Sequence, residues 1–348
     1  MLNFKKSHIR IISALLTVIF VLTLLPIGQT TFSEPPKTYP TPPGFSDNDY
    51  QKLVDFALQD DNLSKLGWNF EEPQNWEGIT WNDEAEKRVA RIELRSLNLT
   101  GNLDISNYTA LEYLQLSQNQ LSNLDTSNNI ALKSAFLNFN SFTSLDFSNN
   151  TALTRLDVQG NTKLTNLDIS SSTTLTVLHV RFNHLVNLDV SNSTALTILD
   201  VGYNQLTNLD ISNNTALTDL RADSNRLTNL NVSNNIDLTI LRADSNRLKN
   251  LDVSNNINLT SLQADFNLLT SISSLENLND LDFVKLNHNN LDLDNAEIQR
   301  SINIIQNNIR KNDGKFIYTP QLQPPTAQEK IIHIFKLLLS HFENLQSN

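Results

Sequence analysis

The sequence predicts a mainly β solenoid, and three observations support this fold class. Leu217, Leu238 and Leu259 begin units that lie 21 residues apart, and a sustained period of this size is typical of stacked repeats. A short segment of each unit alternates apolar and polar residues, as a strand with one buried face does. An asparagine recurs at one position in every unit from Leu111 to Leu281. We therefore expect about ten short, parallel strands in one continuous ladder.

The repeat extends well beyond these three units. Its register continues backward and forward with steps of 21 residues, except for steps of 22 from Leu153 and from Leu259. A weaker unit begins at Val89, so the predicted repeat region is 89–291. The other units begin at Leu111, Leu132, Leu153, Leu175, Leu196 and Leu281.

Each unit has the form LxxLxLxxNxL. In the unit that begins at Leu217, the alternation places Leu220 and Ala222 inside the coil and Arg221 and Asp223 outside. The chain must turn after the strand, which leaves backbone polar groups facing the interior. A buried asparagine satisfies such groups with its donors and its acceptor. The asparagine column contains Asn119, Asn140, Asn161, Asn183, Asn204, Asn225, Asn246, Asn267 and Asn289.

The second half of the unit reads Leu-Asp-Val-Ser-Asn-Asn. It occurs at 188–193, with Ser193 in the last place, and closely again at 209–214 and 251–256. Its Leu and Val are expected to close the opposite wall, and Ser-Asn-Asn is expected to turn. The aspartates should accept N–H groups of their own turns. This column contains Asp104, Asp125, Asp146, Asp168, Asp189, Asp210 and Asp252, with Asn231 in the remaining place.

The combined pattern resembles the repeats of bacterial extracellular leucine-rich-repeat proteins, with internalins among their relatives. The resemblance covers about 89–291 and rests on LxxLxLxxNxL followed by LDVSNN. It implies a binding protein that uses the concave face of its sheet, for surface adhesion or host interaction in a bacterial member. Because one repeat fold serves many partners, the resemblance does not identify the ligand.

Composition excludes several classes of function. The formal net charge is −11, from 26 Lys and Arg against 37 Asp and Glu, which disfavours a nucleic-acid partner. The chain has no cysteine, so disulfide-bonded caps, thiolate metal sites and lipid attachment at an N-terminal cysteine are excluded.

The first 45 residues predict export. Residues 1–33 combine Lys5, Lys6 and Arg10 with an apolar run over 11–25, as a signal peptide does. An uncleaved anchor is the alternative; cleavage would leave no stable transmembrane anchor. The protein is expected to be secreted or on the cell surface, with the periplasm as a further location. Residues 34–45 form a proline-rich linker, either a semi-rigid spacer or a disordered leader.

The repeats are predicted to have a cap at each end, because an open coil exposes apolar surface. Residues 46–88 form the N-terminal cap, with a helix that begins in a Ser46–Asp49 capping box, followed by Trp68, Trp76 and Trp81. The three tryptophans are expected to pack within this cap; a carbohydrate-stacking platform is the alternative.

Residues 292–323 form the C-terminal cap, with a helix over 295–311 and a strand over 315–321. An amphipathic helical tail is predicted over 324–348. It is expected to dock on the cap, and dimerisation and membrane contact are the alternatives.

The outward side chains of the strands are the predicted partner-binding surface, because the coil does not constrain them. Aromatic residues among charges on a rigid face are typical of protein-binding surfaces; a merely solvated face is the alternative. The candidate residues are Phe136, Phe139, Arg155, Asp157, His179, Arg181, Phe182, Asp200, Tyr203, Arg221, Asp223, Arg242, Asp244, Gln263, Asp265 and Phe266.

Asp223, Asp244 and Asp265 fall in one column, where neighbouring carboxylates repel each other. Arg221 and Arg242 lie one column away and are expected to neutralise them. A basic side chain of a ligand or a Ca²⁺ ion is the alternative.

No pattern indicates an enzyme. The six histidines show no metal-ligand spacing such as HExxH, and His179 between Asp157 and Asp200 would lie on an open face that admits water. We therefore predict a non-enzyme without cofactor or metal that binds a protein of unspecified identity. The alternative function is a glycan-binding or envelope-associated structural protein. The sequence does not indicate the oligomeric state.

Overall fold

The computed structural model describes residues 39–310 and 314–319. Contacts divide the chain into residues 1–40 and 41–348, and the architecture below is that of the second unit. The predicted signal peptide at 1–33 and the predicted tail at 324–348 lie outside the described residues.

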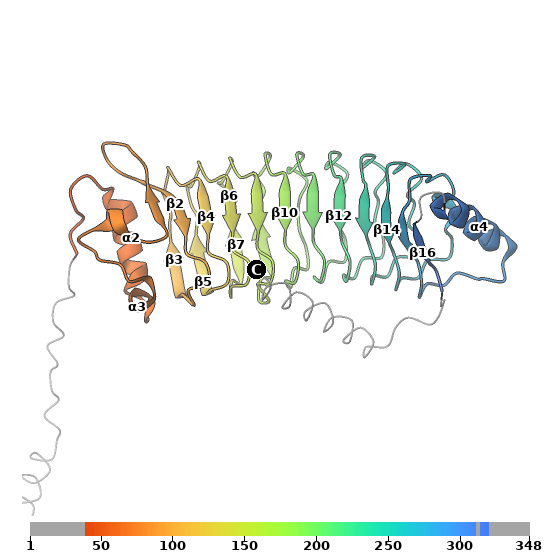
Figure 1. The fold of residues 1–348 in the computed structure, drawn as a ribbon, viewed down its shortest axis with the longest axis horizontal. Helices are drawn as coiled ribbons and strands as arrows, with labels where there is room; N and C mark the ends of the chain where they lie inside the picture. Colours follow the sequence, from red (N-terminus) through yellow and green to blue (C-terminus); the bar gives the residue numbers. More distant parts are fainter. Residues whose placement is uncertain (1–38, 311–313, 320–348) are drawn as a thin grey trace, which may run out of the picture. The chain divides into compact units, whose positions relative to one another are not determined.

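A 12-stranded sheet runs along the described region, and its strands lie side by side in chain order (Figure 1). Antiparallel β1 pairs with β2 at the N-terminal edge, and all other neighbours are parallel. The strands are β1 (Ile79–Trp81), β2 (Val89–Glu93), β4 (Tyr113–Gln115), β6 (Ser134–Phe136), β8 (Arg155–Asp157), β10 (Val177–His179), β11 (Ile198–Asp200), β12 (Asp219–Arg221), β13 (Ile240–Arg242), β14 (Ser261–Gln263), β15 (Phe283–Lys285) and β16 (Lys315–Ile317).

The register repeats from coil to coil without slippage. Leu199 pairs with Leu220, and Leu220 pairs with Leu241, so each leucine lies directly beside its equivalent. These leucines are fully buried, as period-two alternation requires. The predicted solenoid fold with stacked parallel strands is therefore confirmed.

The opposite wall contains shorter regular structure. Two two-stranded parallel sheets form there, β3 (Thr100–Asp104) with β5 (Gln120–Asp125) and β7 (Ser144–Asp146) with β9 (Asn166–Asp168). Thr100–Asp104 is a strand because it continues the ladder of this wall.

The asparagine column acts as predicted. The side-chain amide of Asn204 donates to the carbonyls of Val180 and Val201, at 2.9 Å and 3.1 Å, and its oxygen accepts the Leu185 N–H at 3.0 Å. Each such residue therefore joins its own coil to the preceding one. Because the amides are buried, these bonds replace water that cannot enter.

A second buried asparagine column was not predicted from the sequence. The amide of Asn214 donates to the Val190 and Ser193 carbonyls, at 2.9 Å and 2.8 Å, and Asn235 and Asn256 repeat this geometry. We had treated these residues as ordinary turn residues. Their 21-residue recurrence was the available signal.

The aspartates of the opposite wall bind their own turns, as predicted. The carboxylate of Asp189 accepts the N–H of Ser191 at 2.9 Å, and Asp210 and Asp252 accept from Ser212 and Ser254 at 3.0 Å. Hydrogen bonds from these serines lower the pKa of all three aspartates. This column of negative charge is thus explained by the turns of the fold.

The N-terminal cap begins with α2 (Asp47–Ala57), α3 (Asn62–Leu66) and η1 (Pro73–Asn75). The predicted capping box is wrong, because Ser46 makes no side-chain capping bond. Asp49 is instead buried and binds Arg88 at 2.8 Å and the Val89 N–H at 2.9 Å. It thereby fastens α2 to the first parallel strand.

Tryptophan packing completes this cap. The Trp76 ring stacks on Trp68 with centroids 4.6 Å apart and on Tyr50 with centroids 5.4 Å apart. Phe45, at the end of the predicted linker, meets Trp81 edge-on at 4.9 Å. Because Trp68 and Trp76 are buried, they do not offer faces to a carbohydrate.

The last coil is covered by helix α4 (Ala296–Arg310) and strand β16, with η2 (Ser273–Leu275) before them. Ile298, Ile302, Ile305 and Ile309 bury the apolar face of α4. The predicted helix-plus-strand cap is therefore confirmed.

Candidate functional site

Three columns of side chains leave the outward face of the 12-stranded sheet, the side opposite the buried leucines. In one coil they are represented by Asp219, Arg221 and Asp223, and we call them the first, second and third columns. A fourth column follows the third and contains Ser224 in that coil. The outward face is therefore broader than the surface that we predicted.

Most predicted candidates lie on this face, although their exposure differs from the prediction. Half-buried residues of the second column include Phe136, Asp157, His179 and Gln263. The third column is more enclosed than predicted: Asp223, Asp244 and Asp265 are 3%, 8% and 1% exposed. Buried carboxylates require compensating charge or protonation, so their partners determine what this column can do.

Arg181 supplies much of that compensation. Its guanidinium donates to both carboxylate oxygens of Asp223, at 2.9 Å and 2.7 Å, and to Asp200 at 3.2 Å. Gly202 lies beneath it, since a Cβ at residue 202 would be 2.3 Å from Arg181 Nη1. The absence of a side chain at Gly202 thus lets Arg181 reach an aspartate two repeats away. Despite Arg181, burial raises the pKa of Asp200.

The predicted neutralisation by Arg221 and Arg242 is wrong. Arg221 binds Asp219 of its own strand, with nitrogen–oxygen distances of 3.1 Å and 2.8 Å. Arg242 makes no ion pair within residues 39–310 and 314–319, and its Nε is buried without a hydrogen bond. Asp219 forms an ion pair with Arg221 because both side chains extend from the same side of β12. We did not consider this pairing. Arg242 is left as an uncompensated cation.

The two ends of the aspartate column are neutralised, but its centre is not. Lys285 binds Asp265 at 2.8 Å, and Arg181 binds Asp223. Asp244 lies between them, and its carboxylate has neither a hydrogen bond nor an ion pair to any described residue. Burial and the neighbouring charges of Asp223 and Asp265 raise its pKa well above the ordinary aspartate value.

The fourth column carries large aromatic residues in an unusual backbone conformation. Phe139, Phe182, Tyr203 and Phe266 have φ values between +52° and +58°, where a side chain other than glycine costs about 1 kcal/mol. The Phe182 and Tyr203 rings are 4.5 Å apart, and the Arg181 guanidinium lies 5.1 Å and 4.6 Å from them. Aromatic residues thus border the charged third column.

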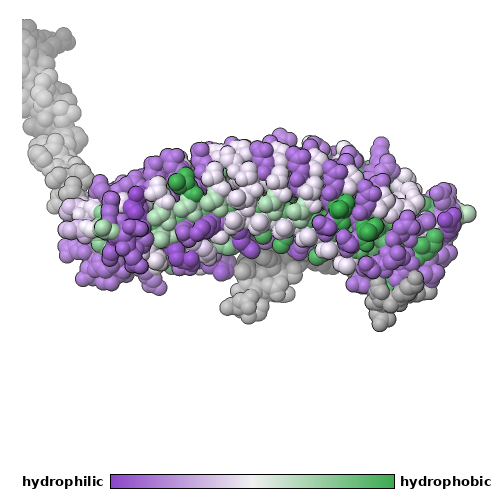
Figure 2. Space-filling model, turned by 90° about the horizontal axis from the view of Figure 1, so that it is seen from above, coloured by the Kyte–Doolittle hydropathy of each residue, from purple (hydrophilic) through white to green (hydrophobic). Residues whose placement is uncertain are grey.

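Most of the first column was not predicted from the sequence. Tyr113, Ile198, Ile240 and Phe283 are half-buried outward residues at the starts of their strands. The signal was present, since Ile198 and Ile240 stand two positions before the candidates Asp200 and Arg242. Among the candidates, only Arg155 belongs to the first column. On the side seen from above, Figure 2 shows less polar residues in a band along the repeats, between hydrophilic margins.

The histidine cluster does not form a catalytic arrangement. His179 Nδ1 lies 3.9 Å from Asp157, outside hydrogen-bonding distance, and Asp200 is bound by Arg181. His179 therefore lacks the two oriented partners that a proton-relay triad requires.

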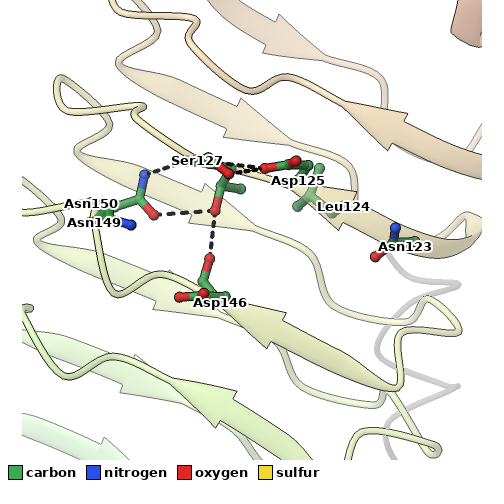
Figure 3. Close-up of a pocket in the computed structure, with 8 residues that line it drawn as sticks. Asn123, Leu124, Asp125, Ser127, Asp146, Asn149 and Asn150 are labelled. Atoms are coloured by element: carbon green, nitrogen blue, oxygen red, sulfur yellow. Dashed lines mark hydrogen bonds between the residues drawn. The ribbon is translucent and has the colours of Figure 1, made fainter.

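A polar pocket of about 280 Å³ opens on the opposite wall, between β5 and β7 (Figure 3). Thr126 occupies a position where other coils place Val, Ile or Phe. Its hydroxyl donates to the Asp146 carbonyl at 2.7 Å and contacts Asn150 at 3.2 Å. Asp125 accepts the N–H of Ser127 at 2.9 Å, so the polar groups of this pocket bind one another. We assign the pocket to the interruption between the two small sheets.

The described region offers no metal cage: no group of three or more His, Asp or Glu side chains within it could hold an ion. None of its helices combines the length and apolar character that would cross a bilayer.

The fold and the repeat together define the class of the protein. A parallel ladder with a period of about 21 residues, leucines on its inner side and an asparagine column after the strands is the leucine-rich-repeat β-solenoid. The chain has this fold.

Comparison with solved structures gives the particular relatives. The chain is similar to the functional domain of InlJ from Listeria monocytogenes, described as including a cysteine ladder, with 30% identity, 58% of this chain and 50% of that chain covered, and a TM-score of 0.46. It is also similar to an internalin, InlF from Listeria monocytogenes, with 24% identity, coverage of 58% and 67%, and a TM-score of 0.48. Internalins are thus among the similar structures.

A third similar structure is the leucine-rich-repeat ectodomain of the plant receptor kinase GASSHO1/SCHENGEN3 from Arabidopsis thaliana in complex with Casparian strip integrity factor 2. It has 20% identity, covers 70% of this chain and 36% of that chain, and has a TM-score of 0.54, which supports the shared fold. This chain spans about half the length of the InlJ domain. No protein-family model and no curated protein sequence matches it.

Proposed function

We propose that this protein binds a protein partner through the outward face of its 12-stranded sheet, outside the cell or on its surface. The function is recognition without catalysis. The proposal includes adhesion or host interaction as the setting, because the repeats resemble those of bacterial extracellular proteins.

The observation that carries the proposal is the unpaired charge of Arg242 on this face. A half-buried guanidinium without an ion pair leaves donors that a partner's carboxylate or carbonyl groups satisfy. Ile240 begins the strand that carries Arg242, and Phe266 stands in the fourth column of the next coil. Arginine and aromatic residues on a rigid surface are typical of the centre of protein interfaces.

Two further observations support the proposal. The leucine-rich-repeat ectodomain of a similar plant receptor kinase was solved in complex with Casparian strip integrity factor 2. That ectodomain therefore belongs to a protein that binds a partner. Export is supported by the basic and apolar composition of 1–33, which is typical of a signal peptide. A glycan-binding role through the cap loses support, because Trp68 and Trp76 are buried.

The partner is sought on intact cells that export the protein. A photoreactive phenylalanine analogue is placed at Gln263, on the outward face, and for control at Asn234, which is exposed on the opposite wall. We expect a protein to be crosslinked from Gln263 only. Crosslinking from Asn234 alone would move the interface to the opposite wall.

The affinity of the purified crosslinked partner is then measured against two charge-reversed variants. We expect Arg242→Glu to weaken binding at least about tenfold, since a guanidinium at the interface would become a carboxylate. Arg247→Glu is the matched control, because Arg247 is exposed in the same repeat but lies outside the outward columns. Equal affinities of both variants and the unaltered protein would contradict the proposal.

A further inference from the structure

Asp244, at the centre of the third column, has a buried carboxylate without a cation bound to it among the described residues. Asp244 is 8% exposed and has no hydrogen-bond or ion-pair partner within the described part of the chain. Its two neighbours in the column are bound, Asp223 by Arg181 at 2.7 Å and Asp265 by Lys285 at 2.8 Å. These cations are therefore engaged with the outer carboxylates, and the middle one has none of its own.

The fourth column changes character beside this carboxylate. Tyr203 packs at a tilt against Phe182 before it, and Phe266 stacks with His288 after it, at centroid distances of 4.5 Å and 4.2 Å. Ser224 and Ser245 stand between the two aromatic pairs. With strands about 4.8 Å apart, the three steps from Tyr203 to Phe266 span roughly 14 Å. We call Ser224 and Ser245 the serine gap.

The serine gap is a departure from the pattern of the array. Ser224 and Ser245 have the same left-handed backbone as the aromatic residues, with φ of +55° and +56° against +58° at Phe182. The backbone therefore accepts an aromatic residue at this position of the repeat. Small side chains thus follow Asp223 and Asp244 in the sequence, whereas large rings follow Arg181 and Asp265.

We propose that Asp244, seen through the serine gap and flanked by Tyr203 and Phe266, receives a lysine or arginine side chain of the protein partner. An incoming ammonium or guanidinium would give Asp244 the charge-assisted hydrogen bond that the fold does not supply. The two flanking rings already face cations of this chain, Tyr203 facing Arg181 at 4.6 Å and Phe266 facing Lys285 at 6.0 Å, so Asp244 is the anchor for the ligand. The site rests on the proposed function, since it names the chemistry that this face recognises.

Other charges near Asp244 are compatible with a cationic ligand. Asp223 and Asp265 add negative charge, whereas Lys285 and Arg181 offset part of it. Arg242 extends from β13 two residues before Asp244 but makes no ion pair with it, so it remains available to an acidic group of the same partner.

The test uses three short peptides with the full chain: N-acetylated, C-amidated Gly-Gly-Arg-Gly-Gly and its lysine and glutamine counterparts. Binding is followed by NMR spectroscopy at pH 8. We expect saturable binding of the arginine and lysine peptides, at least about tenfold tighter than that of the glutamine peptide. Equal binding of all three would overturn the inference.

Variants locate the binding. Asp244→Asn keeps the shape of the side chain and is expected to abolish the preference for the cationic peptides. Asp237→Asn, at an exposed aspartate at the end of the preceding repeat, is the matched control and should leave the preference intact. Ser245→Phe should also abolish the preference, because it extends the aromatic column over the carboxylate. Retention of the preference in both Asp244→Asn and Ser245→Phe would overturn the site.

The two proposals fail separately. Loss of the cationic preference, with crosslinking from Gln263 preserved, would remove the cation site and leave partner binding by this face. A cationic preference that depends on Asp244, without any crosslinked protein from Gln263, would support the site and contradict the protein partner.

Discussion

Arg181 binds the carboxylate of Asp223 through two hydrogen bonds, although the two residues lie two repeats apart. Their side chains are 11% and 4% exposed, so this ion pair lies within the outward face. Arg181 also binds Asp200 and packs against the rings of Phe182 and Tyr203. One side chain thus joins charges and aromatic residues from three consecutive coils.

We predict that Arg181→Gln destabilises the protein by about 3–5 kcal/mol, because removing one partner of a buried ion pair leaves uncompensated charge. The free energy of unfolding in urea measures the loss. Arg226→Gln serves as the control, since Arg226 is exposed. An equally small effect of both substitutions would show that the Arg181 network contributes little to stability.

We predict that Gly202→Ala destabilises the protein by about 1–3 kcal/mol, the usual cost of overpacking an enclosed site. The new Cβ would lie 2.3 Å from Arg181 Nη1 and 2.9 Å from an Asp223 oxygen. In an Arg181→Gln background the same substitution should cost markedly less, because the clashing guanidinium is gone. Urea unfolding of the two single variants and the double variant measures this coupling, and additive losses would contradict it.

The repetitive parts of the fold were predictable from the sequence, whereas the partners of individual charges were not. Leu220 and Asn225 recur because every coil has the same interior, so a period of 21 residues reveals them. The partner of Arg181 depends on the empty space above Gly202, which is a property of one repeat only. The partner of Arg221 depends on Asp219, which lies in a column that the motif does not mark.

For the candidate surface, too, the repeating features were predictable from the sequence and the surroundings of individual side chains were not. The alternation of the strands placed Gln263 and Arg242 on the outward face, because period two is imposed by the backbone. It could not show that Asp244 is buried, since burial of an outward residue depends on side chains from the neighbouring coils. Ser224 and Ser245 were visible in the sequence. Their position next to a buried carboxylate could not be recognised until the structure showed that Asp244 is buried.

We predict that Asn204→Ala costs about 1–3 kcal/mol, because it leaves the buried Leu185 N–H without a hydrogen bond, whereas the Val180 carbonyl keeps its bond from Asn183. The Leu185 N–H and the carbonyl of Val180 would lose the partner that Asn204 provides. Asn213→Ala is the control, since Asn213 is exposed and makes one bond of 3.2 Å to Ser191. Thermal and urea unfolding should separate the two variants, and equal stabilities would contradict a structural role of the buried column.

The last prediction concerns the pH dependence of stability at Asp244. Its raised pKa means that the folded protein holds this proton more tightly than the unfolded chain does. Between the ordinary aspartate pKa of about 3.9 and the raised folded value, the free energy of unfolding therefore falls as pH rises. Deprotonated Asp244 destabilises the fold, and this contribution disappears when acid protonates it.

Asparagine cannot ionise, so Asp244→Asn should remove this contribution. We expect the variant to have a higher melting temperature than the unaltered protein at pH 8, with the difference shrinking as the pH falls towards 4. Asp237→Asn, at an exposed side chain, should show no such trend. Parallel melting curves for Asp244→Asn and the unaltered protein across this range would mean that Asp244 ionises normally. A stability gain from Asp244→Asn together with loss of cationic-peptide binding would instead show that this carboxylate is kept for a ligand at the expense of the fold.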